Sequence, residues 1–331
     1  MSSRQVLSAL AGAAAVTTAI LAAPAQAHVH ASACKPLTNV EAIVDDSGSM
    51  FGTDPNVLRG QAVKLIIKQQ AQTQPSFIFG GVSFGDGATT LFAPAAVGAN
   101  KAAMLGSLAS LQADDGSTNY GAAFAQAATD NAGRQANIFM TDGGNNGDPI
   151  PFPQPPTYVI GFGDSAALPE DQQALQNLAT TTGGQYYPQT TSAKLVSVVN
   201  GVLAQITCQS QPQTFNDTFT KVGQAISHSV KISSKTKSAN FVVSYPTKDD
   251  LFTFSSSEIL SGSKASAAKK HRVKKLKVKL VRSETFFTAH VRGLKRGKLR
   301  FKIKAKQLGT SLDPTNPAGT VTTQFSPSRK R

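Results

Sequence analysis

The hydrophobic pattern of the chain changes at Cys208, and this change restricts the fold more than any other feature. Between residues 38 and 207, short apolar runs alternate with stretches whose apolar residues recur every three or four positions. Alternating strands and helices predict an α/β domain with a doubly wound, mostly parallel sheet and helices on both faces. Beyond Cys208, apolar residues recur at every second position, as in Lys298–Lys306. Short half-buried strands of this kind predict an all-β domain resembling a small antiparallel sandwich.

Charge divides the chain at the same place. Residues 28–208 contain 7 Lys and Arg against 13 Asp and Glu, whereas residues 209–331 contain 25 against 6. The formal net charge of +14 therefore comes from the second part. The polar segment Gln209–Gln213 follows the change of sign, so we predict one domain at 34–208 and a Lys-rich β domain at 209–331.

The N-terminus has the pattern of an export signal. Arg4 precedes a stretch rich in Ala, Leu and Val, and residues 25–27 read Ala-Gln-Ala, the small-x-small pattern that signal peptidase cleaves. We therefore predict a signal peptide at residues 1–27 and an extracellular protein, either secreted or associated with a surface. Beyond this segment, no apolar run approaches the about 20 residues that a membrane span requires.

Two cysteines bracket the predicted α/β domain. Cys34 precedes the first patterned segment, and Cys208 follows the last helical one. In an exported protein, such a pair is expected to form a disulfide that joins the two ends of one domain. Alternatively, Cys34 is a lipid-modified N-terminus, because Ala31–Cys34 faintly resembles a lipoprotein-processing site. The Leu that is usual in such a site is missing, and Cys208 would then be left unpaired.

Oxygen-bearing side chains gather in three loops of the predicted α/β domain. Asp45–Ser49, which reads Asp-Asp-Ser-Gly-Ser, follows the apolar run Val40–Val44. Thr118 lies in a polar loop between two helical stretches, and Asp142 follows the predicted strand Ala136–Met140. Such loops converge at the C-terminal edge of a parallel sheet. Two carboxylates and three hydroxyls, without His or Cys, suit Mg²⁺ or Mn²⁺, and also Ca²⁺ if the site is roomier.

In this arrangement, Asp45, Ser47, Ser49, Thr118 and Asp142 resemble the metal-ion-dependent adhesion site of the von Willebrand factor type A domain. Residues 38–207 as a whole look like such a domain. The resemblance implies that Ser47 and Ser49 ligate the metal directly, Thr118 directly or through water, and the two aspartates mainly through water. Further matching segments are Val82–Asp86, Ile160–Gly163 and Leu178–Tyr187.

The resemblance also implies a partner that supplies an acidic residue to the metal. The ligand-binding rim that it implies consists of Asp46, Gly48, Met50, Asn119, Tyr120, Gly143 and Gly144. Asp46 departs from the family pattern, in which a small residue is more usual, and it is expected to add negative charge near the ion. The alternative to metal binding is that Asp-Ser-Gly-Ser and Thr-Asp-Gly are ordinary loop and helix-cap sequences.

These features predict a secreted binding or adhesion protein rather than an enzyme. Ser47 and Ser49 lack a plausible general base, because all five histidines lie outside the predicted α/β sheet. They are His28, His30, His228, His271 and His290. The competing class is a structural or assembly component of an extracellular complex, in which the domain packs without binding a regulated ligand.

The β domain has two segments in which basic and apolar residues alternate. If the strands that begin at Lys275 and Lys298 share a sheet, their basic side chains form a ladder that attracts anionic polymers, such as wall glycopolymers or acidic polysaccharide. The alternatives are a solvated face that protects sheet edges, or docking on the acidic domain over its metal site. Base-specific nucleic-acid recognition is not expected, because no recognition helix or stacking motif is evident. The candidate polyanion-binding residues are Lys275, Lys277, Lys279, Lys298, Arg300, Lys302 and Lys304.

Overall fold

The computed structural model describes residues 34–113, 115–163, 167–189, 194–260, 272–310 and 318–329. The predicted signal peptide lies outside these residues, as do Ala31–Ala33 and three of the histidines, His28, His30 and His271.

The first sheet, sheet A, has six strands, which are β1 (Asn39–Asp45), β2 (Ile78–Phe84), β3 (Ala88–Ala96), β4 (Ala136–Thr141), β5 (Thr157–Gly161) and β6 (Tyr186–Pro188). Their order is β3-β2-β1-β4-β5-β6. Every neighbouring pair is parallel except β2–β3, which is antiparallel and forms one edge. The central strands β4 and β5 are buried along their whole length, as strands covered on both faces must be.

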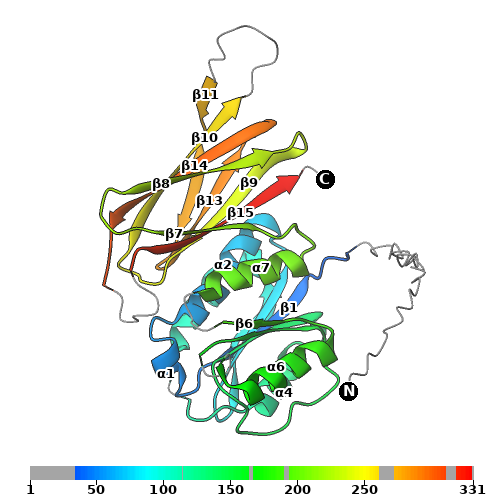
Figure 1. The fold of residues 1–331 in the computed structure, drawn as a ribbon. Coiled ribbons are helices and arrows are strands. Elements are labelled where there is room, and N and C mark those ends of the chain that lie inside the picture. The colour runs from blue at the N-terminus through cyan, green and yellow to red at the C-terminus, as the bar shows by residue number, and fades with distance from the viewer. Residues whose placement is uncertain are drawn as a thin grey trace, which may run out of the picture. The chain divides into compact units, whose positions relative to one another are not determined.

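Helices cover both faces of sheet A, and the prediction of a doubly wound α/β fold is confirmed. They are α1 (Met50–Thr53), α2 (Leu58–Thr73), α3 (Val97–Ser107), the 3₁₀ turn η1 (Leu108–Ser110), α4 (Tyr120–Asp130), α6 (Pro169–Thr182) and α7 (Leu195–Ile206). On one face, α2, α3 and α7 contribute Val63, Met104 and Val199 to one apolar cluster. On the other, α4 and α6 contribute Phe124 and Leu178 to a second cluster (Figure 1).

Nine strands follow, which are β7 (Gln213–Thr218), β8 (Ala225–Ile232), β9 (Thr236–Ser244), β10 (Leu251–Leu260), β11 (Arg272–Lys275), β12 (Val278–Arg282), β13 (Phe286–Arg292), β14 (Gly297–Gln307) and β15 (Thr320–Arg329). They form sheet B, in the order β12-β13-β9-β15-β7, and sheet C, in the order β11-β10-β14-β8. All pairs within these sheets are antiparallel. The prediction of an antiparallel β domain is therefore confirmed.

Sheets B and C share one aromatic core. Phe241 of sheet B lies with its ring centroid 4.8 Å from the rings of both Phe254 and Phe301 of sheet C. Phe301 and Phe254 are almost parallel, with centroids 5.9 Å apart. Because alternate residues of each strand point toward this core, the intervening basic residues of β14 point outward.

The predicted continuous strand over Lys275–Val281 is wrong. Arg272–Lys275 pairs with β10 in sheet C, and Val278–Arg282 pairs with β13 in sheet B. Between them, Leu276 is 8% exposed and packs into the core that the two sheets share. The chain thus passes from sheet C to sheet B at Leu276, whose side chain is buried between them.

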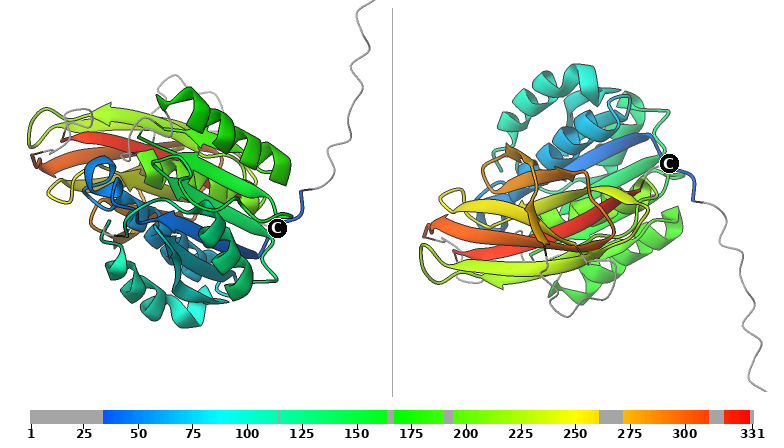
Figure 2. Two further views of the ribbon diagram at one scale, coloured as in Figure 1. Left: turned by 90° about the horizontal axis from the view of Figure 1, so that it is seen from below. Right: turned by 90° about the horizontal axis from the view of Figure 1, so that it is seen from above.

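The β domain packs on α2 and α7 through sheet B, and residues 35–331 form one compact unit. In Figure 1 these helices lie between sheet A and sheet B, and Figure 2 shows the same elements from below and above. A buried apolar cluster joins the two parts, formed by Leu65, Val196, Val242 and Phe286. Polar contacts surround it: Asn200 Nδ2 donates to Gln324 Oε1 at 2.9 Å, and Gln61 Nε2 donates to Glu284 Oε2 at 3.1 Å.

Both cysteines are disulfide-bonded, as predicted, and neither is free. The chain contains only these two, Cys34 and Cys208, so the bond joins the residues that bracket the α/β domain. None of the helices in the described part of the chain is long and apolar enough to cross a membrane.

Candidate metal centre

Two adjacent parallel strands bring Asp45 and Asp142 to the same edge of sheet A. Asp45 is the last residue of β1, and Asp142 directly follows β4. The register pairs Val44 with Met140, so the two strands end side by side. Asp45 is 0% exposed and Asp142 is 1% exposed, which makes them costly to ionise unless a cation or hydrogen-bond donors surround them.

Two neighbouring serine hydroxyls, each hydrogen-bonded to one carboxylate, lie between the two aspartates. Ser47 Oγ donates to Asp45 Oδ1 at 2.5 Å, and the Ser47 backbone N–H donates to the same oxygen at 2.9 Å. Ser47 Oγ lies 3.2 Å from Ser49 Oγ, which donates to Asp142 Oδ1 at 2.8 Å. The structure thus brings four of the five predicted ligands into one contiguous set of oxygens.

Thr118, the fifth predicted ligand, lies beside this set. A Cβ placed on Gly143 would come within 3.8 Å of Thr118 Oγ1, so this hydroxyl lies next to the residue that follows Asp142. Thr118 is 4% exposed, and its carbonyl accepts a hydrogen bond from the Asn146 backbone N–H at 2.8 Å. The loop that carries Thr118 is therefore tied to the loop after β4.

The electrostatics of the two carboxylates suit a cation. Burial raises the pKa of Asp45 to about 6, against the effect of hydrogen bonds from Ser47 and Thr141, and the charge of Asp142 raises it further. Burial also raises the pKa of Asp142. A divalent ion among their oxygens would favour both ionised forms. Two carboxylates and three hydroxyls fit such an ion. The described residues contain no cluster of three or more His, Cys, Asp or Glu side chains that could hold a metal ion.

Two threonines that the sequence analysis missed orient the carboxylates. Thr141 Oγ1 donates to Asp45 Oδ2 at 2.6 Å, and Thr53 Oγ1 donates to Asp142 Oδ2. Each aspartate therefore has one oxygen toward the serines and the other held by a threonine. The sequence does carry a signal for both, since Thr141 directly precedes Asp142 and Thr53 lies one helical turn after Ser49.

Asp46 lies inside the protein and not on the rim, contrary to the expectation. It is 5% exposed, and its Oδ1 lies 2.5 Å from Arg59 Nη2. The backbone N–H groups of Gln112 and Ala113 donate to its two oxygens at 3.1 and 2.8 Å. Asp46 is thus paired with Arg59 and hydrogen-bonded to the backbone inside the protein, away from the rim.

Arg59 connects Asp46 to a second buried carboxylate. Arg59 is 0% exposed, and its Nη1 donates to Asp54 Oδ2 at 3.1 Å. Asp54 also accepts the backbone N–H groups of Leu58 and Arg59 at 2.8 and 2.9 Å, which caps the start of α2. This buried ion cluster of Asp46, Asp54 and Arg59 joins the loop after β1, the start of α2 and the loop that leads to Thr118.

The other predicted rim residues divide into buried and accessible ones. Met50 is 0% exposed and Tyr120 is 3% exposed, and the Tyr120 hydroxyl donates to the Gly143 carbonyl, so neither forms an open surface. Asn119 caps α4, because its Oδ1 accepts the Ala122 backbone N–H at 2.9 Å. Gly48 is exposed, whereas Asn119, Gly143 and Gly144 are partly exposed.

Phe51 lies on the accessible side of the centre and was missed by the sequence analysis. Its side chain is 77% exposed on α1, two residues after Ser49, which is also exposed. The β domain contacts α2 and α7, and it leaves this side of the metal centre accessible. The β domain thus docks on the α/β domain, as one of the alternatives expected, and it leaves Ser49 and Phe51 exposed.

The predicted polyanion-binding residues do not form one ladder. Lys298, Arg300 and Lys302 are exposed and Lys304 is partly exposed on β14 of sheet C, whereas Lys277 and Lys279 are exposed beside sheet B. Lys275 pairs with Ser257 at the edge of sheet C. On β14, Arg300 stands between Ser257 of β10 and Ser229 of β8, and Lys302 stands between Ser255 and Ser227. We call Lys298, Arg300, Lys302 and Lys304 the basic face of sheet C.

Comparison with known proteins agrees with this fold. Residues 41–145 match the family model of the von Willebrand factor type A domain. All five candidate metal ligands fall within this segment. The protein therefore contains a von Willebrand factor type A domain, and an antiparallel β domain follows it.

Three solved structures illustrate the likeness. A von Willebrand factor type A protein from Catenulispora acidiphila aligns over 89% of this chain and 63% of its own, with 14% identity and a TM-score of 0.42. Proximal thread matrix protein 1 from the mussel byssus, with a zinc-occupied MIDAS motif, aligns over 56% and 50%, with 16% identity and a TM-score of 0.39. The pilus adhesin SpaC from Lactobacillus rhamnosus GG aligns over 88% and 44%, with 11% identity and a TM-score of 0.42.

The chain thus spans less than two thirds of the length of each of these structures. No curated protein sequence matches it.

Proposed function

We propose that this is an extracellular binding protein that holds an acidic residue of a protein partner through a divalent cation. The cation would be Mg²⁺ or Mn²⁺, with Ca²⁺ as the alternative, bound by Asp45, Ser47, Ser49, Thr118 and Asp142. The observation that carries the proposal is the chain of oxygens from Asp45 through Ser47 and Ser49 to Asp142, at a sheet edge that the β domain leaves accessible. When bound, the ion supplies a positive charge that attracts a carboxylate.

The residues around the ion have separate tasks in this proposal. Thr141 and Thr53 hold one oxygen of each aspartate, which leaves the opposite oxygens directed toward the serines. The proposed ligand set among the described residues contains two carboxylates, which balance a divalent charge without exceeding it, so an acidic side chain of the partner remains attractive. Phe51, 77% exposed beside this position, offers an apolar contact to the same partner. The proposal assigns no catalytic step to these residues.

Metal binding is expected to stabilise the protein by mass action. At a Mg²⁺ or Mn²⁺ concentration of about 100 times Kd, the free energy of unfolding should rise by about 2.7 kcal/mol, which a thermal melt with and without EDTA detects. Asp45→Ala and Asp142→Ala should abolish the increase. Asp249→Ala, an exposed aspartate of the β domain, is the matched control and should retain it. If neither ion changes the melting temperature of the parent protein, this result would contradict the proposed metal centre.

The same experiment extends to the partner's carboxylate. Bound Mn²⁺ with open coordination positions enhances the relaxation of water protons, and N-acetylglutamate N-methylamide should reduce this enhancement by displacing water. The glutamine analogue, which lacks the charge, should leave it unchanged. If Mn²⁺ binds and the two compounds behave alike, the alternative of a structural component of an extracellular complex is favoured instead.

A second function is supported by the basic face of sheet C. Its side chains stand in a row along one strand, and serines on both neighbouring strands flank Arg300 and Lys302, so this surface suits a linear polyanion. Arg300→Gln together with Lys302→Gln is expected to lower the salt concentration at which the full chain elutes from immobilised heparin. Lys35→Gln together with Lys194→Gln removes the same charge from the α/β domain and should change elution less. Equal shifts would show that only net charge matters.

A further inference from the structure

A separate basic pocket lies on sheet B, beyond the part of that sheet that the helices cover. It has a volume of about 680 Å³ and lies along β12 and β13. Its polar lining consists of Lys277, Lys279, His290 and Arg292, and Leu276 and Val278 provide apolar lining. The residues of this pocket are distant in the chain from the metal ligands. The pocket lies on sheet B, whereas the basic face lies on sheet C.

The strand register explains why the basic groups converge. Lys279 stands directly opposite His290 across the β12–β13 pair, so both side chains emerge on the same face of the sheet. Arg292 lies two residues after His290 on the same strand and therefore points to the same side. The next strand, β9, places Asn240 opposite His290, and Asn240 Oδ1 lies 2.5 Å from His290 Nδ1. This contact fixes the imidazole ring at the pocket wall.

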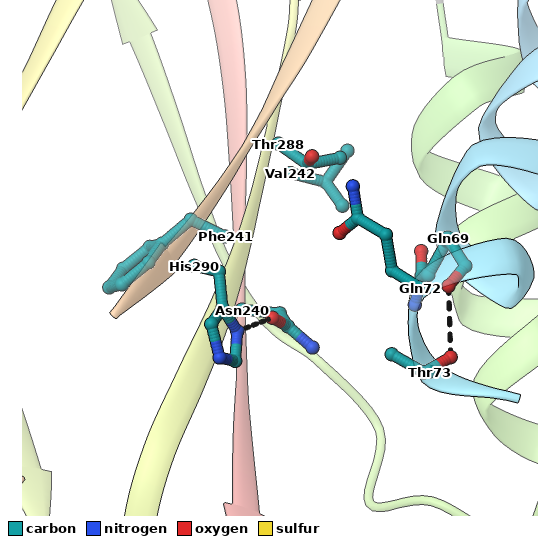
Figure 3. A pocket seen from close by; sticks show the side chains of 8 residues that line it. All are labelled: Gln69, Gln72, Thr73, Asn240, Phe241, Val242, Thr288 and His290. Atoms are coloured by element: carbon teal, nitrogen blue, oxygen red, sulfur yellow. Dashed lines mark hydrogen bonds between the residues drawn. The ribbon is translucent and has the colours of Figure 1, made fainter. Parts of the chain in front are cut away.

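The surroundings of His290 are positively charged or neutral. Burial lowers the pKa of His290, and the charges of Arg292 and Lys279 lower it further. Figure 3 shows uncharged polar side chains near His290, namely Asn240 and, at the end of α2, Gln69, Gln72 and Thr73. Farther along the same face, Lys68 lies over the ring of Phe286. None of the residues that line the pocket is acidic, and no ion pair among the described residues involves Lys277, Lys279 or Arg292.

We propose that this pocket binds a phosphorylated sugar. Two lysines and one arginine offer several donors to a phosphate dianion, and Arg292 can engage two of its oxygens at once. His290 becomes a further donor through Nε2 when the bound anion favours the imidazolium. The volume of about 680 Å³ exceeds what an inorganic ion fills and lies within the range of small-molecule sites. Leu276 and Val278, whose side chains pack into the core between the sheets, border the pocket, and its volume leaves room for a sugar ring beside the phosphate. The phosphorylated unit can come from a free sugar phosphate or from a phosphate-bearing polymer.

Calorimetric titration of the full chain with glucose 6-phosphate tests the proposal. The parent should bind this probe and not glucose, and Lys279→Gln together with Arg292→Gln should weaken binding by about tenfold or more. Arg300→Gln together with Lys302→Gln, which removes the same charge from the basic face of sheet C, should change affinity by less than about twofold. Absence of binding by the parent, or an equal loss in both double variants, would overturn the proposal.

Two further arms use the same proteins. A phosphodiester-linked glycerol phosphate oligomer, titrated in parallel, identifies the source: tighter binding than glucose 6-phosphate assigns the pocket to a polymer, and weaker binding assigns it to the free sugar. Glucose 6-sulfate, which does not titrate near neutral pH, should raise the pKa of His290 as followed by NMR, because the bound anion favours the imidazolium. An unchanged His290 resonance at saturating ligand would show that the anion binds elsewhere and would overturn the assignment.

Discussion

Arg59→Met is expected to lower the free energy of unfolding by about 3–5 kcal/mol, because it leaves two buried carboxylates without their cation. Arg59 is 0% exposed, Asp54 is 1% exposed and Asp46 is 5% exposed. Arg59 contacts both carboxylates, at 2.5 and 3.1 Å, and its charge opposes the effect of burial, which raises the pKa of Asp54. Met has a similar length and little shape penalty, so the lost charge dominates the effect. Chemical denaturation of the parent and the variant measures it.

The same substitution should also loosen the metal centre. Asp46 holds Ala113, whose φ of 60° is unfavourable for a residue with a Cβ, through a hydrogen bond from its backbone N–H. Val57, between Asp54 and Arg59, has a φ of 50°, which is more unfavourable still for a β-branched residue. Two strained positions thus flank the ion cluster, and we expect them to relax when it is broken.

Arg300→Met is the matched control, because Arg300 is exposed on the basic face of sheet C and its change should cost less than about 0.5 kcal/mol. A loss below about 1 kcal/mol for Arg59→Met would mean that Asp46 and Asp54 are not held as a charged pair.

Glu41→Gln is expected to stabilise the protein at alkaline pH by an amount on the order of 3–5 kcal/mol. Glu41 lies in the middle of β1 and is 0% exposed. Its Oε2 accepts a hydrogen bond from Asn131 Nδ2 at 2.9 Å, while its Oε1 has no partner among the described residues. Burial raises the pKa of Glu41 to about 8. Gln keeps the shape and the contact with Asn131 but cannot ionise.

The sign of the pH dependence follows from this raised pKa. Between the usual glutamate pKa of 4.5 and about 8, the folded chain keeps a proton that the unfolded chain has released. The contribution of Glu41 to stability is therefore complete below pH 4.5 and is lost as the pH rises through about 8. Denaturation curves at pH 5 and pH 9 should show a large difference between parent and variant only at the higher pH. Glu170→Gln, at an exposed position of α6, should show no such trend. If the difference in stability between the Glu41→Gln variant and the parent is the same at pH 5 and at pH 9, this result would contradict the raised pKa of Glu41.

Local sequence patterns sufficed to predict the doubly wound, mostly parallel type of sheet A and to place the loops of the candidate ligands at one edge of it. An apolar run that ends at Asp45 and another that ends just before Asp142 mark two parallel strands, and parallel strands place their C-terminal ends at one edge. The two supporting threonines could have been found by the same reasoning. Thr141 directly precedes Asp142 in the chain, and Thr53 lies one helical turn after Ser49.

The position of Asp46 was not predictable in this way. Asp46 is next to a candidate ligand in the chain, and adjacency alone suggested that it adds charge to the rim. Its partners come from α2 and from the loop before Thr118, and only the packing of these segments shows that it is paired with Arg59 inside the protein. The prediction of one strand through the Lys-rich segment around Leu276 was wrong for a related reason. Alternation of polar and apolar residues does not reveal where the chain passes from one sheet to another.

What the amino-acid sequence determined by itself is the set of properties that depend on neighbouring residues: the two fold types, the change of charge between them, and the oxygen donors at the ends of strands. Tertiary structure alone decided which charges meet and which side chains remain accessible. It buried Asp46 against Arg59, joined the β domain to α2 and α7 away from the metal centre, and collected His290, Lys279 and Arg292 around one pocket. The physical reason is that hydrophobic periodicity records only whether a side chain is buried, whereas an ion pair or a pocket depends on which distant segment is buried against it.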